Sequence, residues 1–127
     1  MWGKPPFSIA GNSAIDVRNL ATSREWYKKT LGLREALDDR EEDSGRRFVD
    51  LRFANDETLM SLLQLKPGAS PESGHVIFYA KNLEKAQQWL AEREVFVEPI
   101  TADSGGNRFF RFHDLEGNKI EVCIEPS

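Results

Sequence analysis

The sequence is poor in cysteine and has no long apolar run. Its 127 residues include a single cysteine, Cys123, which excludes an internal disulfide and suits a reducing compartment such as the cytoplasm. No apolar stretch approaches the roughly 20 residues that a membrane-spanning helix needs. Residues 1–8 lack the apolar segment of a secretory signal, and their two adjacent prolines predict a loose arm. We therefore expect a cytoplasmic protein without a membrane partner.

An excess of positive charge is also missing. The chain has 17 Lys and Arg against 21 Asp and Glu, a net charge of −4, and its cations are spread along the sequence. Nucleic acid is therefore not an expected partner. The acidic run at residues 38–43 is followed by Arg46 and Arg47, and we interpret it as a solvated hairpin connection. A hydrophobic content of 39% is typical of one globular domain, here residues 1–127.

Apolar periodicity predicts the same order of elements twice. Helices are expected after the capping residues Asn19 and Asn82. Residues 66–74, rich in Pro, Gly and Ser, read as a linker between modules 9–66 and 74–125. The expected strands are 13–17, 33–36, 47–54 and 58–65 in the first module, and 75–80, 95–100, 108–113 and 118–124 in the second. The sequence thus predicts an α+β fold with two βαβββ modules.

Identical residues at a constant offset support this internal repeat. Asn19, Leu20 and Trp26 recur 63 positions later as Asn82, Leu83 and Trp89. The two tryptophans lie at helical spacing and are interpreted as core anchors.

The last predicted strand carries the main candidate for chemistry. Ile120, Val122 and Ile124 alternate with Glu121 and Cys123, so the carboxylate lies on the face opposite the branched apolar residues. Cys123 is interpreted as an inert hydrophobe rather than a nucleophile. If Ser61 and Glu121 point into a common hollow, then Leu63, Ile77, Tyr79 and Cys123 line it too, by alternation.

Two motifs give the chain a resemblance to a known family. Residues 17–27, with Leu31 and Gly32 after them, resemble the strand-to-helix signature of the glyoxalase/bleomycin-resistance/extradiol-dioxygenase family, or vicinal oxygen chelate superfamily. Residues 114–121 are similar to its closing Asp-Pro-Asp-Gly-Asn-x-Ile-Glu motif, with Leu115 in place of proline. The resemblance implies that the modules form a curled mixed sheet around a concave cavity. It also implies a small-molecule ligand and a homodimer.

The resemblance further implies a divalent-metal site with up to four protein ligands. The four positions are occupied here by Asn12, Ser61, His75 and Glu121, and two of these, His75 and Glu121, are good ligands. Such a pair suits Zn, Ni, Mn, Co or Fe. Asn12 and Ser61 are then expected to contact the ligand rather than a metal.

Two functions remain open at this point. The first is a metal-dependent lyase or isomerase in which His75 and Glu121 bind the ion, or Glu121 acts as a general base. The second is a metal-free protein that binds or sequesters a drug-like molecule. Extradiol dioxygenation is disfavoured, because it requires two histidines and a carboxylate. The remaining histidine, His113, is interpreted as a turn or surface residue.

Overall fold

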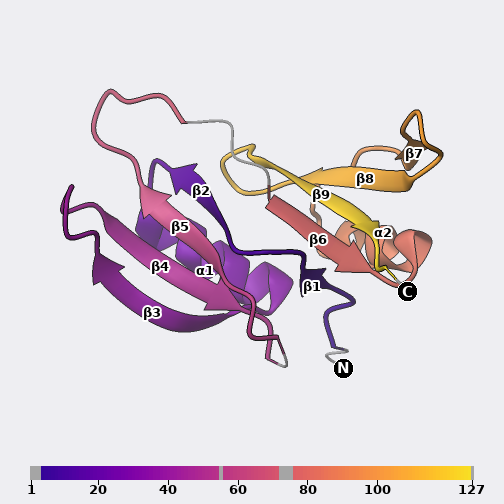
Figure 1. Ribbon diagram of the computed structural model, residues 1–127, viewed down its shortest axis with the longest axis horizontal. Coiled ribbons are helices and arrows are strands. Elements are labelled where there is room, and N and C mark those ends of the chain that lie inside the picture. The colour runs from indigo at the N-terminus through magenta and orange to yellow at the C-terminus, as the bar shows by residue number, and fades with distance from the viewer. Residues whose placement is uncertain (1–3, 55, 72–75, 127) are drawn as a thin grey trace.

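The computed structural model describes residues 4–54, 56–71 and 76–126, which form two mixed sheets, each backed by one helix (Figure 1). The elements are β1 Ser8–Ile9, β2 Ser13–Val17, α1 Leu20–Leu31, β3 Arg34–Arg40, β4 Arg47–Arg52, β5 Met60–Gln64, β6 Val76–Ala80, α2 Leu83–Ala91, β7 Thr101–Ala102, β8 Arg108–His113 and β9 Lys119–Ile124.

Both sheets have the same topology. The first is ordered β2-β5-β4-β3, and the second is ordered β6-β9-β8-β7 with β1 added beside β6. In each module the first strand pairs in parallel with the last, whereas the remaining pairs are antiparallel. The predicted α+β fold with two βαβββ modules is confirmed. The module bounds 9–66 and 74–125 and the linker 66–74 stay predictions, since positions 72–75 lie outside the described residues.

Both predicted helix caps are present. The side-chain oxygen of Asn19 accepts from the backbone N–H of Thr22 at 3.1 Å, and that of Asn82 accepts from Lys85 at 3.0 Å. The first helix ends at Gly32, whose φ of 74° lies in the left-handed region that glycine tolerates. These local signals fix where each module's helix begins.

The predicted strand at residues 95–100 is wrong. Only Val97 forms a bridge, with Phe112, and regular pairing beside β8 resumes at β7. Backbone bonds flank this bridge on both sides, from Glu98 to Arg111 at 2.8 Å and from His113 to Phe96 at 3.0 Å. The ring of Pro99 then fixes φ at about −65°, away from the value of an antiparallel strand, so regular pairing does not continue. The second module therefore has a short, irregular edge.

The buried side chains form one core that spans both modules. Its fully buried members include Tyr27, Leu31, Val49 and Leu62 from the first module and Phe78, Leu90, Phe110 and Phe112 from the second. Trp26 and Trp89 are partly buried and pack against this core. Because the core crosses from one module to the other, side-chain packing contributes to holding the modules together.

The N-terminal arm is not loose, contrary to the prediction from its prolines. Phe7 is only 9% exposed, and its ring packs against four aromatic rings: Phe53, Phe78, Trp89 and Phe112. Two residues on, the N–H of Ile9 donates to the Asp56 carboxylate at 2.8 Å. The sequence did not predict this contact, because Phe7 follows two prolines and is not part of a periodic apolar pattern. The arm ties one module to the other.

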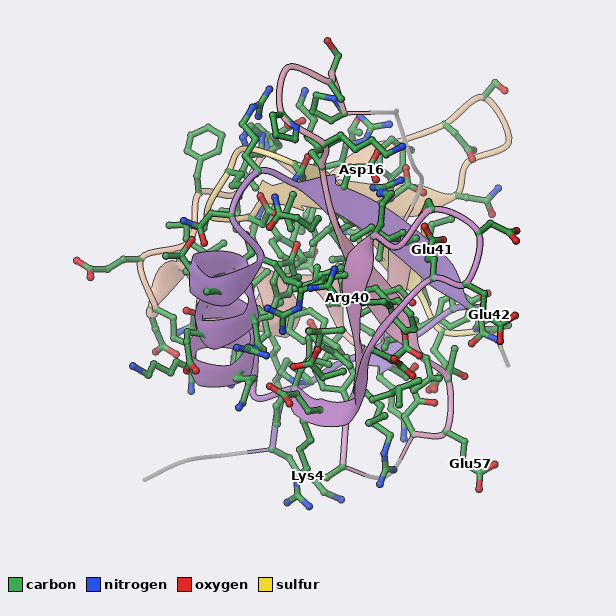
Figure 2. The ribbon with its side chains drawn as sticks, turned by 90° about the vertical axis from the view of Figure 1, so that its left-hand side faces the viewer. Lys4, Asp16, Arg40, Glu41, Glu42 and Glu57 are labelled. Atoms are coloured by element: carbon green, nitrogen blue, oxygen red, sulfur yellow. The ribbon has the colours of Figure 1, made fainter. Side chains whose placement is uncertain are left out.

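The acidic run lies at the end of β3 and in the turn that follows. Asp38 pairs with Arg24 at 2.8 Å and with Arg47 at 3.2 Å. Glu42 is exposed and points outward, as does Glu57 (Figure 2). The interpretation as a solvated hairpin connection is wrong for residues 38–40, which pair with β4, and agrees with the placement of residues 41–43 in the turn. Among the described residues, neither helix has the length and apolar character needed to cross a bilayer.

Candidate functional site

Strand alternation gives the second sheet two unlike faces. Phe110, Phe112, Ile120 and Val122 are buried in the core. The intervening residues of β8 and β9 lie on the opposite side, which we call the open face. They include the cross-strand pairs Phe109–Cys123 and Arg111–Glu121. The open face is where the predicted site residue Glu121 lies.

A hollow of about 770 Å³ lies on the open face. The loop after β7 forms one side of it, including Asp103 and Asn107, and the end of the chain forms another, including Glu125. Its floor contains Phe109, Arg111, Glu121 and Cys123. A size of this order accommodates a small organic ligand.

The carboxylate of Glu121 is occupied by two neighbours in the hollow. A guanidinium nitrogen of Arg111 lies 3.4 Å from one carboxylate oxygen, and the Cys123 thiol donates to the other at 3.2 Å. The Arg111 guanidinium also lies 5.1 Å from the centre of the Phe109 ring. The side chains of Arg111 and Glu121 remain 42% and 27% exposed, so their pairing is loose and open to a ligand.

Two other charged groups around the hollow have structural partners, whereas the acid Glu125 at its edge is exposed. Asp103 accepts from the N–H groups of Gly105 and Asn107 at 2.9 and 3.0 Å, and these bonds to its own loop lower the pKa of its carboxyl group. Arg108 pairs with Glu84 at the start of α2. The charged groups that the floor offers to a ligand are Arg111 and Glu121, with Glu125 at the edge of the hollow.

The structure brings together only some of the predicted site residues. Cys123 lies beside Glu121, and Ile77 and Tyr79 pair across β6 and β9 with these two residues. Tyr79 lines a separate pocket of about 400 Å³ beside the N-terminal arm. His75 lies outside the described residues.

The predicted residues of the first module do not line this hollow. Ser61 and Leu63 are on β5, and the Ser61 hydroxyl donates to Asp50 of β4. Asn12 accepts from the N–H of Leu59 at 3.1 Å. The side chains of Asn12 and Ser61 thus bond within their own module.

The donors that the structure describes do not fit a divalent metal. Within residues 4–54, 56–71 and 76–126, no three His, Cys, Asp or Glu side chains are grouped closely enough to hold an ion. Glu121 is paired with the Arg111 guanidinium and the Cys123 thiol. The side-chain oxygens of Asn12 and Ser61 form hydrogen bonds within the first module.

Sequence reasoning missed Arg111. The signal was present, because an antiparallel hairpin closed by the turn at 114–118 places residues equally distant from the turn opposite each other. His113 then faces Lys119, and Arg111 faces Glu121. Counting outward from the turn identifies the partner of the carboxylate.

The fold and the closing motif agree with a match to a family of known proteins. A sequence model described as the Glyoxalase/Bleomycin resistance protein/Dioxygenase superfamily matches residues 11–122. The chain belongs to this superfamily. A search of curated proteins finds no significant match.

Solved structures of other superfamily members have the same fold. A superfamily member from Sphaerobacter thermophilus is 24% identical, with a TM-score of 0.72, and the match covers 91% of this chain and 95% of that one. A glyoxalase/bleomycin resistance protein from Streptomyces sp. CB03234 is 21% identical, with a TM-score of 0.67 and coverage of 89% and 97%. Lactoylglutathione lyase from Agrobacterium tumefaciens is 20% identical, with a TM-score of 0.66 and coverage of 95% and 96%. At these identities the likeness concerns the fold.

The contact between Cys123 and Glu121 predicts a thiol of low reactivity. Burial, and then the neighbouring Glu121 carboxylate, raise the pKa of Cys123 from 9.0 to about 11. Glu121→Gln removes the charge that opposes thiolate formation, so we expect alkylation by iodoacetamide at pH 8 to become about 3- to 10-fold faster. Glu125→Gln, which changes an exposed acid of the same hollow, is the control and should leave the rate unchanged. Equal rates in both variants would contradict the contact.

Proposed function

We propose that this superfamily member binds a small organic molecule in the hollow on the open face, without a metal. The observation that carries the proposal is the loose Arg111–Glu121 pair on a floor that also contains the Phe109 ring. The pair offers N–H donors and a carboxylate acceptor side by side, and the ring offers a flat apolar surface. Few polar groups on a partly apolar wall are typical of small-molecule sites.

The charges of the pair restrict the chemistry of the ligand. An anionic ligand that approaches Arg111 is repelled by Glu121, and a cationic ligand that approaches Glu121 is repelled by Arg111. A neutral planar group with an adjacent donor and acceptor, such as an aromatic carboxamide, satisfies both side chains at once. The proposed ligand class is therefore neutral, flat and amide-like.

The catalytic alternative is a lyase or isomerase in which Glu121 accepts a proton from the bound molecule. Its support is the placement of the carboxylate on the floor of the hollow. Asn12 and Ser61 are bonded within the first module, and Glu121 is paired with Arg111, which favours binding over metal-dependent catalysis.

Nitrogen-15 chemical-shift mapping with three matched probes tests the binding proposal. We expect benzamide to shift the amide signals of Phe109 and Glu121 and the Arg111 side-chain signal more than benzoate or benzylammonium does. Arg111→Gln should weaken benzamide binding by about 10-fold, the effect of losing one charged hydrogen-bonding group. Arg40→Gln, an exposed arginine of the first sheet, is the matched control.

Two results would overturn the proposal. The first is the absence of shifts in the hollow with every probe in a broader aromatic panel. The second is a rise in melting temperature with Ni, Co, Mn or Zn that disappears in both His75→Ala and Glu121→Ala, since specific ion binding stabilises the folded state.

The homodimer that the resemblance implies stays part of this proposal. Leu37 on the edge strand β3 and Ile124 at the end of β9 are each 46% exposed. These side chains lie on different sheets, and a second copy that covers either one would bury apolar surface.

A further inference from the structure

The turn between β8 and β9 bonds to the first module, although it belongs to the second. One carboxylate oxygen of Glu116 accepts from the backbone N–H of Arg18 at 2.7 Å, and the other accepts from that of Asn19 at 2.9 Å. The second oxygen also accepts from the Ser23 hydroxyl at 3.1 Å. A single side chain therefore makes three hydrogen bonds to residues more than 90 positions away.

Glu116 provides the acidic hydrogen-bond acceptor that is missing from the first turn of α1. In many helices an acid at the third helical position reaches back to the N–H of the capping residue. Here the cap is Asn19 and the third position is Thr22, and the described first turn of α1 has no acidic residue. The Glu116 carboxylate takes over this bond from the other module and places negative charge at the positive end of the helix.

Asp114 holds this turn in shape and adds a second tie. One of its oxygens accepts from the N–H groups of Glu116 and Asn118 at 2.9 and 2.8 Å. The other accepts from the hydroxyl of the buried Tyr27 on α1 at 2.5 Å. Residues 114–118 thus present Glu116 to the helix from a fixed position.

The modules are fastened at two places of different chemistry. In Figure 1 the turn between β8 and β9 reaches toward β2 at one end of the junction, and β1 with the arm lies at the other end. The arm fastening is apolar, through Phe7, whereas the fastening at the turn is polar. Within the polar fastening, the bonds of Glu116 to Arg18 and Asn19 are exposed to water, whereas the bond of Asp114 to Tyr27 is buried like the aromatic cluster. The Glu116 bonds therefore open at the lowest cost.

We propose that residues 114–118 are a latch that sets the angle between the two modules, with Glu116 as its lock. Opening the latch frees the second sheet, in which β9 is paired with β6, to change its angle to the first sheet about the end held by the arm. The β8–β9 hairpin of the second sheet carries Arg111 and Glu121, so the latch also positions the floor of the hollow. The proposal does not depend on whether the hollow binds a ligand.

Amide hydrogen exchange measured by NMR on the full chain tests the lock. In Glu116→Ala we expect the amides of Arg18 and Asn19 to exchange at least 10-fold faster, with the core amides of β9 nearly unchanged. Glu116→Gln keeps one acceptor oxygen and should give an intermediate effect, and it serves if the alanine variant folds poorly. Glu42→Ala, an exposed acid in the turn after β3, is the control and should change neither amide.

Residual dipolar couplings test the angle. In the wild type, couplings from the two sheets should fit one alignment tensor, whereas in Glu116→Ala the two sheets should require different tensors. Unchanged exchange at Arg18 and Asn19 would overturn the assignment of Glu116 as the lock. Faster exchange with one shared tensor would overturn the latch and leave Glu116 as a helix cap alone.

Discussion

Phe7→Ala is expected to lower the free energy of unfolding by about 3–5 kcal/mol, as other deletions of buried aromatic rings do. The ring is 9% exposed and contacts one phenylalanine of the first module and three aromatic residues of the second. Its removal opens a cavity between the modules, which the surrounding rings cannot fill because they are fixed by their own strands and helix. Urea unfolding followed by circular dichroism measures the change.

The chain offers a matched control in Phe96, whose side chain is 64% exposed. Phe96→Ala deletes the same ring from the surface, where it packs edge-on with the His113 ring at a distance of 4.7 Å between ring centres, and should lower stability by less than about 1 kcal/mol. If Phe7→Ala lowers the free energy of unfolding by less than about 1 kcal/mol, or by only as much as Phe96→Ala does, the arm does not stabilise the fold and is loose, as its prolines suggest.

Regular elements were predictable wherever one face of the element is apolar. The sequence predicts β2 and β8 with the bounds that the structure has, because Ile15 and Val17, and likewise Phe110 and Phe112, alternate with polar residues. The helix starts follow from Asn19 and Asn82, whose side chains each accept from a backbone N–H three residues further along the chain. These are properties of a few neighbouring residues.

Tertiary contacts of isolated residues were not predictable in the same way. Phe7 is one apolar residue beside two prolines, and nothing around it in the sequence announces the aromatic cluster that it joins. Val95 and Val97 have the composition of a strand, but pairing with β8 is limited to the bridge at Val97, and the fixed φ of Pro99 ends it. In both cases distant parts of the chain decide the outcome.

The candidate site shows the same division. Alternation places Glu121 opposite the core, and this follows from β9 alone. Whether the carboxylate faces a metal ion or a positively charged side chain depends on β8, and the structure places Arg111 there. The resemblance to the family identified the turn at 114–118 as part of the closing motif. Only the structure shows that Asp114 bonds to Tyr27 of α1, and that Glu116 bonds to Ser23 and to the backbone before the helix. A motif can therefore be recognised before its physical role is known.

Asp114→Ala is expected to lower the free energy of unfolding by about 3 kcal/mol, because it leaves the buried Tyr27 hydroxyl and three partly buried donors without their charged acceptor. Asp114 is 7% exposed and accepts four hydrogen bonds: from the N–H groups of Glu116 and Asn118, the Asn118 amide and the Tyr27 hydroxyl. Burial, followed by the nearby Asp114, raises the pKa of Tyr27 well above its ordinary value, so the phenol keeps its proton and remains the donor.

The loop acid Asp103 is the control for this prediction, since it also accepts from two backbone N–H groups and an asparagine amide but is exposed and has no tyrosine partner. Asp103→Ala should cost about 1 kcal/mol or less, which is typical of a solvated turn. A double-mutant cycle of Asp114→Ala with Tyr27→Phe isolates the tie to α1, and we expect a coupling of about 1–2 kcal/mol between these contacting residues. Equal losses for the two aspartates, with no coupling to Tyr27, would mean that Asp114 only shapes its own turn. A large coupling would mean that the closing motif of the second module stabilises the first helix of the first module, which makes the two halves fold and unfold as one unit.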